Sequence, residues 1–226
     1  MPFPELGARI AVVRSRIQLA AERGGHGQAV TIVAVTKTHG PDAVLAAFDA
    51  GIHDVGENRV QEALGKMPDV SVPVRWHLIG HLQRNKVKSL DRFAMFHALD
   101  SSRLADGVNA FGNERGQPID CLVQVNAARE GTKGGFYMEE LAAESARLAS
   151  MNGLRVQGVM TMGRLDADEA QLRETFARAR EARDTLAADG HPAKELSMGM
   201  SGDYEIAVEE GATIVRLGTT LFGSRE

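Results

Sequence analysis

The strongest constraint on the fold is a regular alternation of short apolar runs with longer stretches of helical periodicity. Several runs, above all AVTIVAVT at 29–36, are almost continuously apolar, as strands buried on both faces of a parallel sheet are. Eight runs are predicted strands: 30–36, 52–55, 74–79, 94–98, 119–125, 155–160, 194–196 and 213–217. The stretches predicted as helices are 42–50, 57–66, 85–90, 102–115, 138–150, 168–188 and 203–210, and apolar residues at helical spacing from Leu6 to Ile17 predict one more.

This order of elements predicts a single (β/α)8 TIM barrel, in which each strand feeds a helix or closes the chain. The chain has 226 residues, which is within the usual length of about 200 to 250 residues for that fold. No low-complexity tract, linker or internal repeat divides it, so residues 1–226 are predicted to form one domain. A doubly wound open sheet gives a similar alternation and stays open as an alternative.

Composition excludes several classes of partner and environment. The formal net charge of −4 provides no basic field that would attract nucleic acid. No uninterrupted apolar run approaches the roughly 18 residues of a membrane span, and the first residues lack the pattern of a secretory signal. The one cysteine, Cys121, cannot form an internal disulfide. These features predict a cytoplasmic protein without a membrane segment.

The end of the first strand carries the first candidate functional residue. In this fold the active site lies at the carboxyl ends of the strands, and Lys37 directly follows the run 30–36. An amine placed at that mouth can attack a carbonyl group and form a Schiff base. The simpler interpretation is a lysine that extends into solvent from a strand end.

The loops after the seventh and eighth strands are candidate phosphate sites. They read SMGMSGD at 197–203 and VRLGTT at 215–220, and both offer glycines, hydroxyls and backbone N–H groups. Asp203 could also open the helix that follows. The loops after these two strands are the usual phosphate-binding position of the fold. Glycine and serine also make ordinary turns, so either loop alone would be weak evidence.

Barrel closure would bring the eighth strand beside the first, and so the phosphate loops beside Lys37. A small ligand with a phosphate at one end and an aldehyde at the other would bridge them, and pyridoxal phosphate (PLP) has that combination. Arg216 could then lie beside the pyridine nitrogen, where a permanent cation disfavours a protonated ring and argues against broad carbanion chemistry. A structural ion pair for Arg216 is an equal alternative. Asn58, after the second strand, could bond the phenolic oxygen.

Other motifs give only weak evidence for a metal or nucleotide site. His77 and His81 have the spacing of a metal pair on a helix, but Gly80 falls between them and no further ligand completes a set. We therefore predict no metal site and interpret His77 as a hydrogen-bonded residue of the core or pocket wall. The loop GTKGG at 131–135 matches neither nucleotide motif, and Lys133 within it is a possible auxiliary amine.

At these residues the sequence resembles the pyridoxal phosphate homeostasis protein family, which is built like the barrel domain of fold-type III alanine racemase. The matching motifs are AVTK at 34–37, GENRVQ at 56–61, WHLIGHLQRNK at 76–86, SMGMSGD at 197–203 and VRLGTTLFG at 215–223. The resemblance implies the following cofactor-binding residues: Lys37 as the Schiff-base lysine, Ser201, Gly218 and Thr219 at the phosphate, Arg216 by the ring nitrogen, and Asn58 nearby.

The resemblance also implies what such a protein does. Members bind and regulate cytosolic PLP without an established catalytic activity, so no catalytic residue is expected. They are largely monomeric, and PLP-dependent apo-enzymes are possible recipients of the cofactor.

Two enzyme classes remain as alternatives. An amino-acid racemase needs a second base opposite the lysine, and in alanine racemases this is a tyrosine from a second domain of the partner subunit. The chain ends at Glu226, soon after the last strand, and is expected to lack that domain; its only tyrosines are Tyr137 and Tyr204. A Schiff-base aldolase needs an acid or base at another strand end, for which Glu57 and Asp166 are the candidates.

Overall fold

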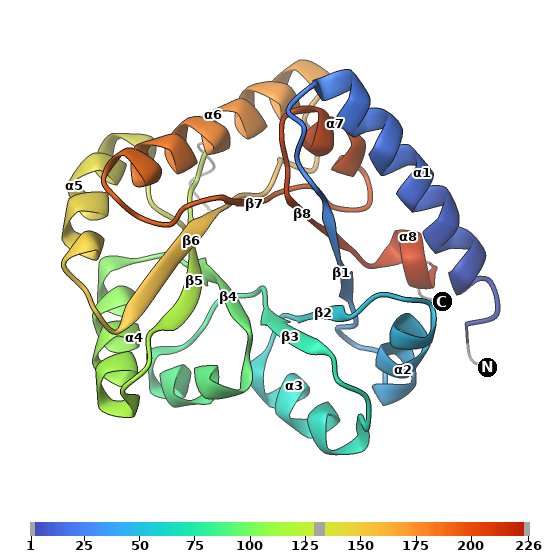
Figure 1. The fold of residues 1–226 in the computed structure, drawn as a ribbon, viewed down its shortest axis with the longest axis horizontal. Helices are drawn as coiled ribbons and strands as arrows, with labels where there is room; N and C mark the ends of the chain where they lie inside the picture. The colour runs from blue at the N-terminus through green and yellow to red at the C-terminus, as the bar shows by residue number, and fades with distance from the viewer. Residues whose placement is uncertain (1–2, 129–133, 224–226) are drawn as a thin grey trace.

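A computed structural model describes residues 3–128 and 134–223, and these residues form a closed barrel of eight parallel strands in sequential order (Figure 1). The strands are β1 (Thr31–Val35), β2 (Asp54–Glu57), β3 (Arg75–Leu78), β4 (Met95–Leu99), β5 (Ile119–Gln124), β6 (Leu154–Met160), β7 (Glu195–Ser197) and β8 (Ile214–Leu217). β1 pairs with both β2 and β8, so the sheet has no free edge. The predicted barrel is confirmed, and the open-sheet alternative is wrong.

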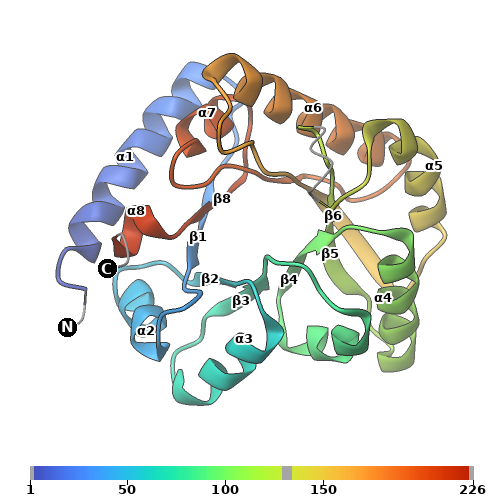
Figure 2. The ribbon, with the colours of Figure 1, turned by 180° about the vertical axis from the view of Figure 1, so that it is seen from behind.

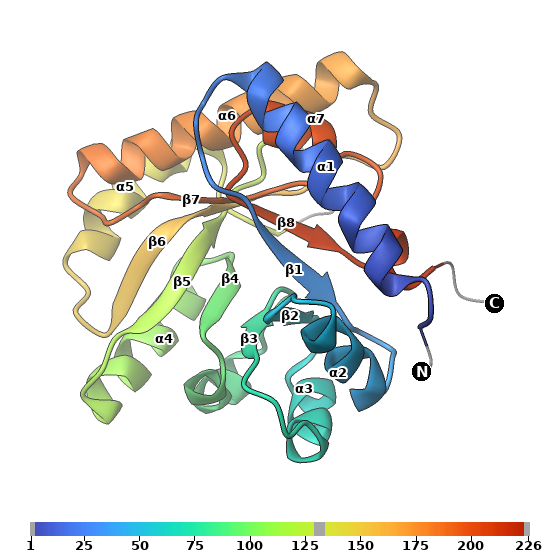
Figure 3. The ribbon, with the colours of Figure 1, turned by 45° about the vertical axis from the view of Figure 1, so that its right-hand side comes forward.

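Helices surround the barrel on its outside (Figures 1 and 2). They are α1 (Leu6–Gly24), α2 (Pro41–Asp49), α3 (Val60–Lys66), α4 (Ser102–Arg115), α5 (Met138–Ala149), α6 (Glu169–Ala188), α7 (Tyr204–Glu209) and α8 (Thr219–Phe222), with 3-10 helices η1 (Met67–Asp69) and η2 (Arg84–Arg92). The predicted first helix is confirmed: α1 buries Leu6, Ile10, Val13 and Ile17 and packs against α7 and α8 (Figure 3). Among the described residues, no helix is both long and apolar enough to span a bilayer.

Two predicted helices differ from the structure. Glu57 belongs to β2, because it pairs in register with Leu78 of β3, and α3 therefore begins only at Val60. The segment predicted as a helix at 85–90 is the 3-10 helix η2. At its start the N–H of Lys86 donates to the carbonyl of Gln83, three residues earlier, which is the 3-10 pattern. Most of the other ends differ by no more than two residues, as element ends commonly do.

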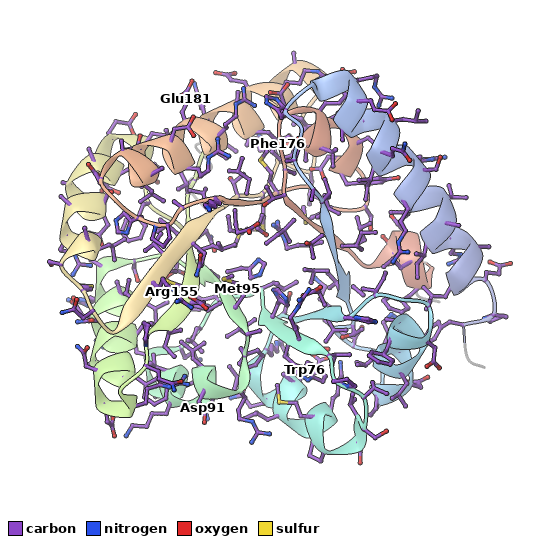
Figure 4. All side chains as sticks on the ribbon, viewed as in Figure 1. Trp76, Asp91, Met95, Arg155, Phe176 and Glu181 are labelled. Atoms are coloured by element: carbon purple, nitrogen blue, oxygen red, sulfur yellow. The ribbon has the colours of Figure 1, made fainter. Side chains whose placement is uncertain are left out.

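The core forms in the layer between strands and helices. Figure 4 shows Phe176 of α6 directed toward the strands, whereas Glu181 of the same helix points away. Phe176 is fully buried, and Trp76 of β3 packs in a small cluster with Val44 and Ala63 of the neighbouring helices. The helices therefore fix the outer face of the barrel wall.

Alternation along the strands decides which side chains face the carboxyl-end mouth. Successive side chains of a strand point to opposite faces. Val35 and Lys37 line the cavity at the barrel mouth, while the hydroxyl of Thr36 between them donates to Glu57 of β2, which in turn bonds to Lys66 of α3. Arg216 and Gly218 share the cavity face at the end of β8 by the same rule.

Candidate functional site

A cavity of about 910 Å³ opens at the carboxyl ends of the strands. Its wall combines residues from the ends of all eight strands and the loops that follow them. All the residues predicted to bind a cofactor line it: Lys37, Asn58, Ser201, Arg216, Gly218 and Thr219. The barrel thus brings together side chains that the sequence separates by up to 182 positions, from Lys37 to Thr219. Their individual roles stay predictions.

Lys37 is held in place by its backbone neighbours. It is half-buried at the start of the turn after β1, and the next residue, Thr38, has a φ of +66°, a left-handed conformation that residues other than glycine rarely adopt. The N–H of Thr38 donates to Oε1 of Glu62, and the ammonium of Lys66 donates to the carbonyl of Thr36 at 2.8 Å. Both anchors come from α3. The helix therefore clamps the turn on each side of Lys37.

The clamp belongs to a polar and charged cluster, which we call the lysine network: the buried Thr36, Glu57 and Lys66 with the partly exposed Glu62. Nζ of Lys66 lies 2.8 Å from Oε1 of Glu57 and 2.8 Å from Oε1 of Glu62, and the hydroxyl of Thr36 donates to the same Glu57 oxygen at 2.6 Å. Burial raises the pKa of Glu57 despite these bonds. Burial acts in the same direction on Glu62, but the bonds from Lys66 and Thr38 outweigh it and lower its pKa.

The loops after β7 and β8 are joined to each other. The N–H of Thr220 donates to Oγ of Ser201 at 3.2 Å. A Cβ built on Gly202 would meet no atom within 4 Å, so the backbone of Gly202 faces open space in the cavity. Asp203 precedes α7 as predicted, but it caps no amide of that helix; its carboxylate accepts from the N–H of Met200 at 2.6 Å.

Arg216 places a buried cation at the cavity. Nη1 of Arg216 donates to the carbonyl and the hydroxyl of Ser197, both at 2.7 Å, and Nη2 donates to the carbonyl of Thr161 at 3.0 Å. Burial lowers the pKa of Arg216 to about 10, with Asp203 acting against the shift. The guanidinium is therefore charged at neutral pH, and its partners on β7 and after β6 fix its plane. These hydrogen bonds all go to uncharged oxygens, and the role of Arg216 stays a prediction.

The opposite wall contains residues that the sequence analysis did not assign to the cofactor site. Gly80 lets the loop after β3 approach Asn58 closely, since a Cβ there would lie 2.4 Å from the carbonyl oxygen of Asn58. His81 and Asp100 also line the cavity, with Nδ1 of His81 2.6 Å from Oδ2 of Asp100. Asp100 directly follows β4, so the rule that strand ends carry function could have found it.

The remaining acid, base and metal candidates among the described residues do not line this cavity. His77 is buried and bonds to His97 and Asp54, which confirms its interpretation as a hydrogen-bonded core residue. The described residues contain no group of three or more His, Cys, Asp and Glu side chains that could hold a metal ion. Lys133 lies outside the described residues. In the described part of the chain, the cavity wall includes none of the other acid or base candidates: Glu57, Tyr137, Asp166 and Tyr204.

Comparison with known proteins agrees with this architecture. The sequence profile of the family described as "Alanine racemase, N-terminal domain" matches residues 10–226. The closed parallel barrel, with its cavity at the carboxyl ends of the strands, is a barrel of this alanine racemase type.

The more closely related proteins define a narrower group. The chain is 40% identical over 224 residues to the pyridoxal phosphate homeostasis protein of Aquifex aeolicus, covering 96% of this chain and 97% of that one. Identity to the protein of the same name from Pseudomonas aeruginosa is 38%, with 98% and 96% covered. PipY of Synechococcus elongatus, solved with PLP bound, is 33% identical with a TM-score of 0.84, covering 96% of this chain and 100% of PipY. The chain belongs to the pyridoxal phosphate homeostasis protein family.

Proposed function

We propose that this chain binds PLP and takes part in its homeostasis. In this proposal the amine of Lys37 holds the PLP aldehyde as a Schiff base, and the loops of Ser201, Gly218 and Thr219 hold the phosphate. Arg216 meets the ring nitrogen, and Asn58 lies near the phenolic oxygen. The observation that carries the proposal is that all these residues wall one cavity.

The polar groups of the cavity fit PLP. PLP supplies an aldehyde that condenses with amines and a ring that withdraws electrons. The Lys37 amine after β1 suits the aldehyde of PLP. The joined loops after β7 and β8, with their hydroxyl groups and the open backbone at Gly202, suit the phosphate. The guanidinium of Arg216, held by Ser197, suits the ring nitrogen. Beside the ring nitrogen, a charged arginine donates a hydrogen bond and disfavours protonation. The electron sink is then weak, which suits holding the cofactor more than transforming amino acids with it.

The absorbance spectrum of the protein with added PLP tests this proposal. We expect a Schiff-base band that Lys37→Ala abolishes, and borohydride treatment followed by peptide mapping should place the cofactor on Lys37. Lys88→Ala is the matched control, because Lys88 is exposed and paired with Glu114 on the surface. Wild-type protein that shows no band with added PLP, or a band unchanged by Lys37→Ala, would contradict the proposal.

We further propose that the chain regulates PLP and does not turn over a substrate. The names of the curated relatives support a homeostatic role. Neither tyrosine of the chain lines the cavity formed by the described residues, so neither is placed as a second base for racemisation. If the wild-type protein abolished the optical rotation of an L-alanine solution and Lys37→Ala did not, the proposal that the chain turns over no substrate would be wrong. The monomeric state and the transfer of PLP to apo-enzymes stay predictions.

A further inference from the structure

A chain of buried polar side chains leads away from Arg216 into the barrel. Nη1 of Arg216 donates to Oγ of Ser197 at 2.7 Å, and this oxygen lies 2.9 Å from Nδ1 of His97. Nε2 of His97 lies 2.9 Å from Nδ1 of His77, and Nε2 of His77 lies 2.9 Å from Oδ1 of Asp54. All five side chains are buried. We call this chain the histidine relay.

The relay passes through the barrel interior instead of following the wall. His97 lies on β4 and Ser197 on β7, and these strands are not neighbours in the barrel, so their hydrogen bond crosses the interior. Arg216 lines the cavity at the carboxyl ends. Asp54 is the first residue of β2 and lines a separate hollow at the amino ends. The relay therefore joins the two ends of the barrel.

The two ends of the relay have opposite hydrogen-bonding character. Burial alone would raise the pKa of Asp54, but bonds from His77 and Arg75 outweigh it and hold that pKa at about 2. The ionised carboxylate only accepts, while the guanidinium of Arg216 only donates. Burial, together with the nearby His77 and Arg216, holds the pKa of His97 well below its ordinary value, so this ring is neutral.

When each ring carries a single proton, one arrangement of protons satisfies every group. Nε2–H of His77 donates to Asp54, and Nδ1 of His77 must then accept from Nε2–H of His97. Nδ1 of His97 accepts from the hydroxyl of Ser197. The Ser197 oxygen keeps its lone pairs for the N–H of Arg216. Each donor thus meets an acceptor from one end of the barrel to the other.

We propose that Asp54 is a positioning residue for Arg216, which it orients through the ordered relay. With Asp54 as the terminal acceptor, the Ser197 oxygen accepts from Arg216 alone among the relay groups. If the relay reversed, the same oxygen would also accept from His97, and its bond to Arg216 would weaken. The direction in which Arg216 presents its remaining N–H groups to the cavity depends on that bond. The link to PLP rests on the proposed function, whereas the proton order is a property of the protein alone.

Nitrogen-15 NMR of histidine-labelled protein, freed of PLP and held at pH 8, tests the proton order directly. We expect one proton on each ring, His77 and His97, and we expect it on Nε2. A proton on Nδ1 of either ring would overturn the proposal. Because this measurement needs no ligand, its outcome is independent of whether PLP binds.

Substitutions of Asp54 test the effect on Arg216. Asp54→Ala removes the terminal acceptor and should move the His97 proton to Nδ1 and weaken PLP binding about fivefold, the net worth of roughly one hydrogen bond. Asp54→Asn keeps an acceptor oxygen and should retain the tautomers and most of the affinity. Asp120→Ala is the matched control: Asp120 pairs with Arg155 at the same end of the barrel, on β5 and β6, outside the relay. Arg155 is labelled in Figure 4.

Ser197→Ala breaks the relay next to Arg216 and completes a double-mutant cycle. It should weaken PLP binding about as much as Asp54→Ala, and the double variant should lose no more than either single variant, since both cut the same connection. Fully additive losses would overturn the proposal, as would an equal loss of affinity in Asp120→Ala. Wild-type protein that fails to bind PLP would instead refute the proposed function and leave the proton order to the NMR result.

Discussion

The lysine network lies between the strand wall and α3, whereas the histidine relay lies inside the barrel. Both begin next to a residue of the cavity, Lys37 in one case and Arg216 in the other. The lysine network consists largely of full charges in direct contact, and all three ammonium donors of Lys66 are used. The relay has full charges at Asp54 and Arg216, and His97 between them is neutral.

This difference separates two ways of supporting a site. Direct ion pairs hold the backbone of the turn that carries Lys37, so their loss should show mainly as lost stability. A relay of neutral groups contributes direction, because each hydrogen bond sets the donor or acceptor state of the next group. Its disruption should show mainly in how the cavity holds a ligand.

The largest expected effect comes from Lys66→Met. This change leaves the buried Glu57 carboxylate next to Glu62 without its cation, which should cost about 3 to 5 kcal/mol in the free energy of unfolding measured with urea. Lys88→Met, at an exposed ion pair, should cost less than about 0.5 kcal/mol. Adding Glu57→Gln to Lys66→Met should recover part of the loss. Equal losses in the two lysine variants would remove the distinction between the networks.

An intermediate effect is expected from acid. The pKa of Asp54 is about 2 in the folded protein, against an ordinary value of 3.8, so its ionisation stabilises the fold above about pH 4. That contribution, about 2 kcal/mol, is lost as the pH falls toward 2. Urea unfolding at a series of pH values should show a shallower decline for Asp54→Asn than for wild type. Parallel curves would mean that the end of the relay is not held as an ion.

The smallest effect is expected from Thr38→Gly. Glycine relieves the cost of a positive φ, but it also gains more freedom in the unfolded chain, so the net change in stability should stay within about 0.5 kcal/mol. Hydrogen exchange of the amides in the turn at 37–40 should nevertheless become faster, because the backbone loses its conformational restriction. Unchanged exchange would show that the anchors from α3 alone rigidify the turn.

Much of the fold followed from local pattern. Buried parallel strands are often continuously apolar, and several of the eight predicted runs are; their alternation with helical stretches predicted the barrel and its closure. The rule that strand ends carry function led to Lys37, Asn58 and Arg216 without knowledge of any contact. The helix prediction at 57–66 was wrong at its start, because the ladder with Leu78 holds Glu57 in β2 and no local signal marks that pairing.

The histidine relay had no sequence signature. His97 and Ser197 lie 100 residues apart, and each resembles an ordinary core residue of its own strand. Asp54 and His77 come from two further strands, and their spacing in the chain matches no motif. Only the register of the closed barrel aligns them.

The sequence by itself determined the order of the elements and which residues stand at the strand ends, because hydrophobic periodicity and turn chemistry are local properties. The tertiary structure decided which of those residues meet. Closing the barrel places β8 beside β1, and the alternation of side chains then directs Lys37 into the cavity and the Thr36 hydroxyl toward Glu57 of β2. A shift of one residue would exchange these two faces, so contacts across the barrel depend on a register that only the packed structure sets.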